Sequence, residues 1–338
     1  MSSFLFRENK NPKTKVRNIA PLNPINQRNK RMNQANNVFL ITLAMIVFGF
    51  LIKKLGYISE KEGKTISRFL MHTTFPALML VSTIRIKLEP SLFLIPVMAF
   101  LLGGIMILIA WFVFKNYPND LRGLLTMGSS GFNTGLFAFP IIEGIWGREG
   151  LVYAIMYDIG NTAVVFGLVY TAGHYFASKG KGHDKVPLGF IVKRVLRSPP
   201  LQAMLIGLTI NALSVPIPTI AIDFLDVLAK GNKPLVLLLM GIYLSFALDK
   251  KELWAVSKVF AIRYACGLSA VVLIYFFVPP SLYQSILIVC VVLPIGMTLL
   301  PFSDELHYDS RIAGLLVNTS LLISFVLMWT LVLGLKLV

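Results

Sequence analysis

Long apolar runs alternate with short polar and basic stretches along most of the chain. The runs are evenly apolar, without the alternation of a barrel strand. Most approach or exceed the roughly 20 residues with which a helix crosses about 30 Å of hydrocarbon. The pattern therefore predicts an all-α polytopic membrane protein with ten transmembrane helices. The predicted segments are 37–55, 66–84, 91–114, 121–146, 150–176, 198–213, 221–248, 255–278, 282–303 and 310–336.

The composition supports a chain that lies mostly within a membrane. Of its 338 residues, 56% are hydrophobic and only 14% are charged, and the mean hydropathy is +0.72. Soluble domains carry about 25% charged residues. The two cysteines, Cys266 and Cys290, both lie in apolar segments, so we expect them to pack between helices. Neither a disulfide framework nor a metal-ligand spacing is present.

The basic residues predict which ends of the helices face the cytoplasm. Ten spans place both termini on one side of the membrane. The odd-numbered loops hold 17 Lys and Arg residues, whereas the even-numbered loops and the C-terminus hold four. The positive-inside rule then places the odd loops in the cytoplasm and both termini outside.

The first residues conflict with that orientation. Residues 1–31 carry eight basic residues and one acid, Glu8, and contain no apolar run of a signal peptide. Three interpretations remain open: the true start is Met32, the tail is a translocated extension, or the termini are cytoplasmic. We expect residues 1–36 to be a disordered basic tail and residues 1–31 to be dispensable. Because the tail supplies +7 of the net charge of +16, the basic balance requires no nucleic-acid partner.

Two similar motifs combine glycine and proline inside apolar segments. Residues 133–140 read NTGLFAFP and residues 294–301 read PIGMTLLP, with each glycine and each final proline 161 residues apart. Glycine lacks a stiffening side chain and proline lacks an N–H group, so both interrupt helices. Matched interruptions in two halves of an apolar chain are the best sequence indication of a transporter binding site.

The repeat extends beyond these two motifs. Phe75-Pro76 corresponds to Lys233-Pro234, and Asn161-Thr162 corresponds to Asn318-Thr319. Each half then holds five spans, and an odd number inverts the second half relative to the first. The predicted units are a first five-helix repeat over 37–178, a cytoplasmic basic linker over 179–197 and an inverted second repeat over 198–338.

Inverted halves place the fourth and ninth spans side by side at mid-membrane, where both helices break. The N-terminus of a half-helix carries partial positive charge that favours a carboxylate, and the Asn133 amide can donate to an anion. The predicted substrate-binding residues are Asn133, Thr134, Gly135, Pro140, Asn161, Pro294, Ile295, Gly296 and Pro301.

Other ionisable groups within the apolar segments are costly and therefore candidates for function. Asp158 and Asn161 share one helix face. Asp158 is either a proton or cation site, or a buried carboxylate that holds the broken backbone by hydrogen bonds. Lys230 and Lys233 either attract an anion or extend to the outer interface. Arg263 is expected to face protein or the cytoplasmic edge.

At these motifs the chain resembles the auxin efflux carrier family, which includes plant auxin carriers and bacterial permeases for malate and other organic acids. The similarity covers about residues 36–338. It rests on Ile66-Ser67-Arg68-Phe69 with Pro76, the two break motifs, and residues 146–151 followed by Asp158 and Asn161. The resemblance implies a scaffold, a moving transport unit with crossed broken helices, carboxylate recognition near Asn133 and a homodimer. The short central loop favours a bacterial protein of the plasma membrane.

The predicted function is secondary active transport of a small organic anion, a carboxylate such as malate or an auxin-like acid, by alternating access. The alternative is a non-transporting membrane sensor that retains the carrier fold. The sequence lacks the metal, nucleophile and nucleotide motifs of common enzymes, so we expect neither catalysis nor a cofactor nor a bound metal.

Overall fold

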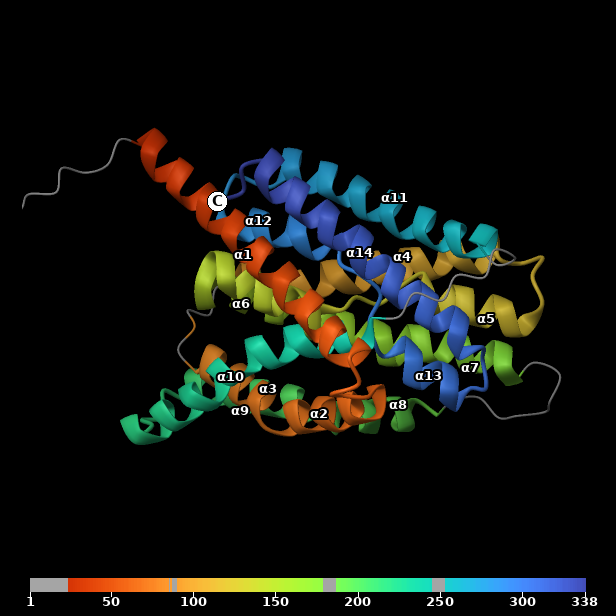
Figure 1. Ribbon diagram of the computed structural model, residues 1–338, viewed down its shortest axis with the longest axis horizontal. Helices are drawn as coiled ribbons and strands as arrows, with labels where there is room; N and C mark the ends of the chain where they lie inside the picture. The colour runs from red at the N-terminus through yellow and green to blue at the C-terminus, as the bar shows by residue number, and fades with distance from the viewer. Residues whose placement is uncertain (1–23, 85, 87–89, 179–186, 245–252) are drawn as a thin grey trace, which may run out of the picture.

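The computed structural model describes residues 24–84, 86, 90–178, 187–244 and 253–338, and every regular element among them is helical (Figure 1). The predicted tail up to residue 23 and the linker residues 179–186 lie outside the described residues. The coarse prediction of an all-helical fold is confirmed for the part of the chain that is described.

The first half of the chain forms short and long helices joined by abrupt breaks. Helix α1 starts well before residue 37, so residues 24–36, which were expected to belong to a disordered tail, are helical. The elements are α1 Pro24–Lys54, α2 Glu60–His72, α3 Thr74–Thr83, η1 Pro90–Phe93, α4 Leu94–Val113, α5 Asn119–Gly128, η2 Thr134–Ala138, α6 Phe139–Ala163, η3 Val164–Val169 and α7 Tyr170–Ser178.

The second half also contains both continuous and broken helices. A short helix, α8, occupies the end of the segment that was predicted as the linker 179–197. The elements are α8 Leu188–Leu196, α9 Pro199–Ala212, α10 Thr219–Tyr243, α11 Leu253–Phe277, α12 Leu282–Cys290, α13 Leu299–Glu305 and α14 Ser310–Gly334.

Among the described residues, five continuous helical stretches are long and apolar enough to cross a membrane. They are Arg28–Lys54, Leu94–Val113, Thr134–Ser178, Leu253–Phe277 and Ser310–Gly334. Large apolar side chains on these helices point outward, and Phe112 is 63% exposed. Such surfaces are unusual on soluble proteins and suit contact with lipid. The chain is therefore a multi-pass membrane protein.

Several of the predicted apolar segments are interrupted or bent. The second segment breaks at Thr73, whose φ of −129° and ψ of −81° lie outside the helical region. Gly147, with a φ of 67°, bends α6 between the predicted fourth and fifth segments. A positive φ is cheap only for glycine, because it has no Cβ. The deepest breaks, residues 129–133 and 291–298, separate α5 from η2 and α12 from α13.

The final prolines of the two motifs lie outside these breaks, which corrects that part of the prediction, whereas Pro294 lies within the second break. The helix resumes at Thr134, so Pro140 lies in the first turn of α6, and Pro301 lies in the first turn of α13. Proline is tolerated in a first turn because the N–H group that it lacks has no acceptor there. Pro301 therefore lies where its second half-helix begins, whereas Pro140 lies six residues after Thr134, where the other second half-helix begins.

The helices pack as two groups, which Figure 1 shows on opposite sides of the molecule. One group contains α2, α3, α9 and α10, joined by α1; the other contains α4 to α7 and α11 to α14. Helices α1 and α10 cross closely at small residues: a Cβ on Gly49 would lie 2.2 Å from the Leu238 carbonyl oxygen. Small residues allow helices to approach closely within a membrane.

Candidate functional site

The two broken segments meet directly, as the repeat predicted. Phe132 and Ile295 form an antiparallel bridge, and the Asn133 N–H donates to the Pro294 carbonyl oxygen at 2.9 Å. Each backbone is extended at this point, so its N–H and C=O groups cannot bond within a helix. Pairing across the crossing satisfies some of these groups, which would otherwise be costly to bury.

Asn161, on α6, holds the first break in place. Its Oδ1 accepts from the Phe132 N–H at 2.8 Å, and its Nδ2 donates to the Phe132 carbonyl oxygen at 2.9 Å. The Asn161 side-chain amide thus makes, with the backbone of Phe132, the two hydrogen bonds that a neighbouring strand would make. Nδ2 also lies 3.1 Å from Oδ1 of Asp158. The predicted pairing of these two residues on one helix face is therefore present.

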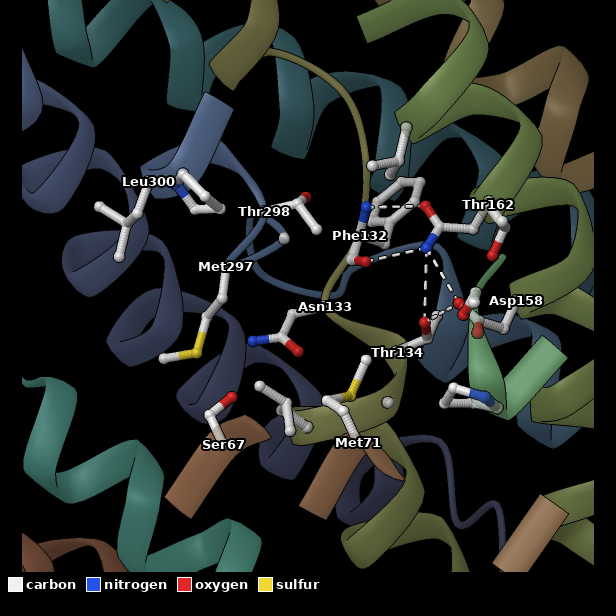
Figure 2. A pocket seen from close by; sticks show the side chains of 18 of the residues that line it. Ser67, Met71, Phe132, Asn133, Thr134, Asp158, Thr162, Met297, Thr298 and Leu300 are labelled. Carbon is white, nitrogen blue, oxygen red and sulfur yellow. Dashed lines mark hydrogen bonds between the residues drawn. The ribbon is translucent and has the colours of Figure 1, made fainter. Parts of the chain in front are cut away.

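Asp158 binds the start of the second half-helix. Its Oδ1 accepts from the Thr134 hydroxyl, in addition to the bond from Asn161 (Figure 2). Asp158 thus connects the side chains of Thr134 and Asn161, and of these Asn161 bonds to the broken backbone. The same side chain lines the cavity described below, and its role as a proton site stays a prediction.

The second break has its own support, from α14. The Ile295 N–H donates to Ser320 Oγ at 3.0 Å, and this hydroxyl donates to the Val317 carbonyl oxygen at 2.8 Å. Both partners of the Phe132–Ile295 bridge are thus held by a buried polar side chain of the following span. Ser320 was not among the residues predicted for the site, although its hydroxyl lies two residues beyond Asn318 of the repeated pair.

A cavity of about 750 Å³ lies beside the crossing. Figure 2 shows the Asn133 side chain pointing into it, between Met297 on one side and Ser67 and Met71 on the other. Asn133 is only 5% exposed, and its Nδ2 has no hydrogen-bond partner in the described part of the chain. A buried donor without a partner is costly, so an acceptor on a bound molecule would stabilise it.

The cavity wall is mostly apolar, and its polar groups lie at two places. The crossing supplies Asn133, Thr134, Asp158 and Asn161. The far end carries charged side chains of α2, α13 and α14, including Lys64, Asp304 and Arg311. Apolar residues line the space between: Met71, Phe75, Leu136, Ile159, Phe166, Met204 and Leu300. The described residues contain no group of three His, Cys, Asp or Glu that could hold a metal ion.

Most of the predicted binding residues gather at this cavity. Asn133, Thr134, Gly135, Asn161, Gly296 and Pro301 line it, as does Asp158. Pro294 and Ile295 lie behind the lining, in the backbone pairing, and Pro140 is buried in the first turn of α6. Gly135 allows close packing, since a Cβ there would lie 2.5 Å from Cζ of Phe75.

Lys230 and Lys233 lie outside the cavity. Lys230 is exposed on α10, and Lys233 packs against α6, where its Nζ would lie 2.6 Å from a Cβ on Gly144. Nearby on the same two helices, Arg148 Nη2 and Asp226 Oδ1 form an ion pair at 2.5 Å. Lys233, Arg148 and Asp226 thus join the two helix groups rather than line the site.

Comparisons with known proteins agree with the sequence motifs. The family model described as "Membrane transport protein" matches residues 37–332. An uncharacterized transporter of Methanothermobacter thermautotrophicus is 30% identical over 61% of this chain and 67% of its own length. An uncharacterized transporter of Methanocaldococcus jannaschii is 27% identical over 62% of this chain and 68% of its own length. Both relatives are archaeal, and the bacterial source stays a prediction.

Proposed function

The chain belongs to the membrane transport protein family, that of the auxin efflux carriers, and we propose that it is a secondary transporter of a small organic anion. The observation that carries the proposal is the unpaired, buried Asn133 amide at the crossing of two broken helices, pointing into a cavity. The proposed mechanism is alternating access across the plasma membrane, with the two helix groups moving relative to each other.

The polar groups at the crossing favour a carboxylate as the bound group. The half-helix that begins at Thr134 leaves the N–H groups of its first turn without acceptors inside the helix, which gives its end partial positive charge. Asn133 adds an amide donor directly before this turn. A carboxylate oxygen can accept from both, and the apolar wall suits the body of an organic acid.

Asp158 provides a means of coupling to protons. A carboxylate substrate beside Thr134 would lie close to the Asp158 carboxylate, and two like charges repel each other. A proton on Asp158 removes that repulsion, so proton binding and anion binding reinforce each other by linkage. The proposed transport cycle therefore moves the anion together with a proton.

We include ten spans and two inverted repeats in the proposal, and two contacts support them. Asn133 and Pro294, which correspond in the repeat, pair through their backbones. The Thr74 hydroxyl donates to Asn232 Oδ1 at 3.0 Å. These two residues also correspond in the repeat, because they directly precede the matched pairs Phe75-Pro76 and Lys233-Pro234. Residues related by a two-fold axis touch only near that axis, so both contacts fit a pseudo-two-fold axis in the membrane plane.

The arrangement of the cavity supports a state that is open toward the cytoplasm. The cavity extends from Asn133 to Lys64 and Arg311, which flank odd-numbered loops. The positive-inside pattern assigns these loops to the cytoplasm. At the other end of the two helix groups, the Arg148–Asp226 ion pair joins α6 to α10.

The test measures thermal stability of the purified chain with a panel of mono- and dicarboxylates. A ligand at about 100 times its dissociation constant adds roughly 2.7 kcal/mol to the stability of the state that binds it. We expect at least one carboxylate to stabilise the wild type and not Asn133→Ala. The matched control is Asn211→Ala, because Asn211 binds the carbonyl oxygens of Ile84 and Ile86 outside the cavity.

Three results are informative. Stabilisation that is lost in Asn133→Ala and kept in Asn211→Ala supports the proposed site. Stabilisation that is kept in Asn133→Ala moves the anion site away from the crossing. If no carboxylate stabilises the wild type, the organic-anion proposal fails.

A further inference from the structure

Arg263, in the middle of α11, is among the largest fully buried side chains of the described residues. Only 2% of its surface is exposed, and the helix around it is apolar. A cation within a membrane-spanning segment is expensive unless its surroundings compensate its charge. No carboxylate bonds to Arg263 in the described part of the chain, so the compensation has another source.

The guanidinium binds the end of one first half-helix and the extended backbone that follows the other. Nη2 donates to the Leu293 carbonyl oxygen at 3.0 Å, and Nη1 donates to the Gly128 carbonyl oxygen at 3.4 Å. Gly128 is the last residue of α5, whereas Leu293 lies within the second break, two residues beyond Val291, the C-cap of α12. The last carbonyl groups of a helix lack partners within it and carry partial negative charge. One cation therefore compensates the end of α5 and a carbonyl group of the extended backbone beyond α12.

The same guanidinium also contacts the bridge between the breaks. Its Cζ lies 4.9 Å from the ring centroid of Phe132, at a distance that favours attraction between a cation and an aromatic ring. Phe132 pairs with Ile295 and is the residue that Asn161 binds. Arg263 thus touches both breaks and the residue through which they pair, from the side of α11.

We propose that Arg263 is the positioning residue of the site: one guanidinium holds the two breaks in a fixed register and offsets the partial negative charge of the carbonyl groups that it binds. The inference rests on the proposed function, because the positioned group is the Asn133 amide. Helix α11 contributes no residue to the cavity lining. The proposal nevertheless adds Arg263, on this helix, to the residues that determine anion affinity. The planar fork is essential, since a lysine ammonium is a single point of charge.

The test is amide hydrogen exchange of the purified full-length chain without ligand, in wild type, Arg263→Lys and Arg263→Met. We expect Arg263→Met to speed exchange in residues 129–133 and 291–298 together, by roughly tenfold or more, as loss of charge-assisted hydrogen bonds implies. Arg263→Lys should rescue this partly. The matched control is Val271→Ala, which opens space at a buried position of the same helix away from both breaks.

A second readout uses binding of benzoate as a monocarboxylate probe. We expect its affinity to fall in the order wild type, Arg263→Lys, Arg263→Met, whereas Val271→Ala keeps wild-type affinity despite lower stability. If Arg263→Met does not fold, Arg263→Lys decides the case through the same two segments. Faster exchange in only one segment, or the same pattern in Val271→Ala, overturns the proposal. If no carboxylate binds the wild type, the proposed function fails, and the exchange data still decide the role of Arg263.

Discussion

Replacement of Asn161 by alanine tests most directly how the backbone at the crossing of the two breaks is held in place. The asparagine satisfies both backbone groups of Phe132, with bonds of 2.8 and 2.9 Å. Phe132 is buried, and in Asn161→Ala its N–H and C=O groups lose these partners. Each unsatisfied buried group costs about 1–3 kcal/mol, so we expect a loss of roughly 2–6 kcal/mol in the free energy of unfolding.

The assay combines thermal unfolding with hydrogen exchange of residues 129–133. We expect faster exchange in this segment, because the Phe132 amide is no longer bonded. The control is Thr162→Val, the adjacent cavity-lining residue, which conserves shape and removes one hydroxyl. A stability of Asn161→Ala within about 1 kcal/mol of this control would refute the reasoning, since even one orphaned group should exceed that difference.

Asn161→Asp adds a dependence on pH whose sign follows from the donors. An ionised carboxylate still accepts from the Phe132 N–H but cannot donate to the Phe132 carbonyl oxygen. It also places a second negative charge one helical turn from Asp158. Protonation of the new carboxyl supplies the missing donor and removes the repulsion. The stability of this variant relative to wild type should therefore rise as the pH falls, and a pH-independent difference would contradict the assignment.

Three further outcomes follow from the site and its surroundings. Gly135→Ala places a Cβ 2.5 Å from Cζ of Phe75, so we expect about 1–3 kcal/mol of destabilisation and weaker carboxylate binding, both reduced when Phe75→Leu is added. Asp158→Asn should make transport rates in proteoliposomes independent of pH, and an unchanged pH dependence would remove the proton-coupling proposal. Arg148→Gln should increase the distance between spin labels on α6 and α10, and Asp226→Asn should increase it by a similar amount. The double variant should increase this distance little further, because both substitutions break the same ion pair. Equal and additive effects would show that the two residues act separately.

Much of the site could be predicted from local sequence. Asn133, Asp158 and Asn161 were identified because polar groups are expensive within apolar segments, and helical spacing placed the last two on one face. The repeat offset indicated that two breaks meet, and Asn133 does pair with Pro294. These inferences needed only the period of a helix and the cost of burying polar groups.

Other features depended on contacts between distant segments. The supporting role of Ser320 follows from its contact with Ile295, and that of Arg263 from carbonyl groups of α5 and α12. Neither residue differs in sequence from an ordinary packing serine or a buried cation. The charge of Lys233 and its position within an apolar segment fitted a residue that attracts an anion. Its packing against α6, however, keeps it outside the cavity lining.

The sequence by itself determined the membrane-spanning helical class, since hydrocarbon cannot satisfy backbone groups and each apolar run must bond within itself. It also indicated that two helices break at related places, because the two similar motifs adjoin or contain both breaks. The tertiary structure alone decided where each broken helix resumes, which side chains hold the extended backbone and that the Asn133 amide has no partner. Those outcomes depend on which groups meet across 25 or more residues of chain, and only packing of the whole molecule brings them together.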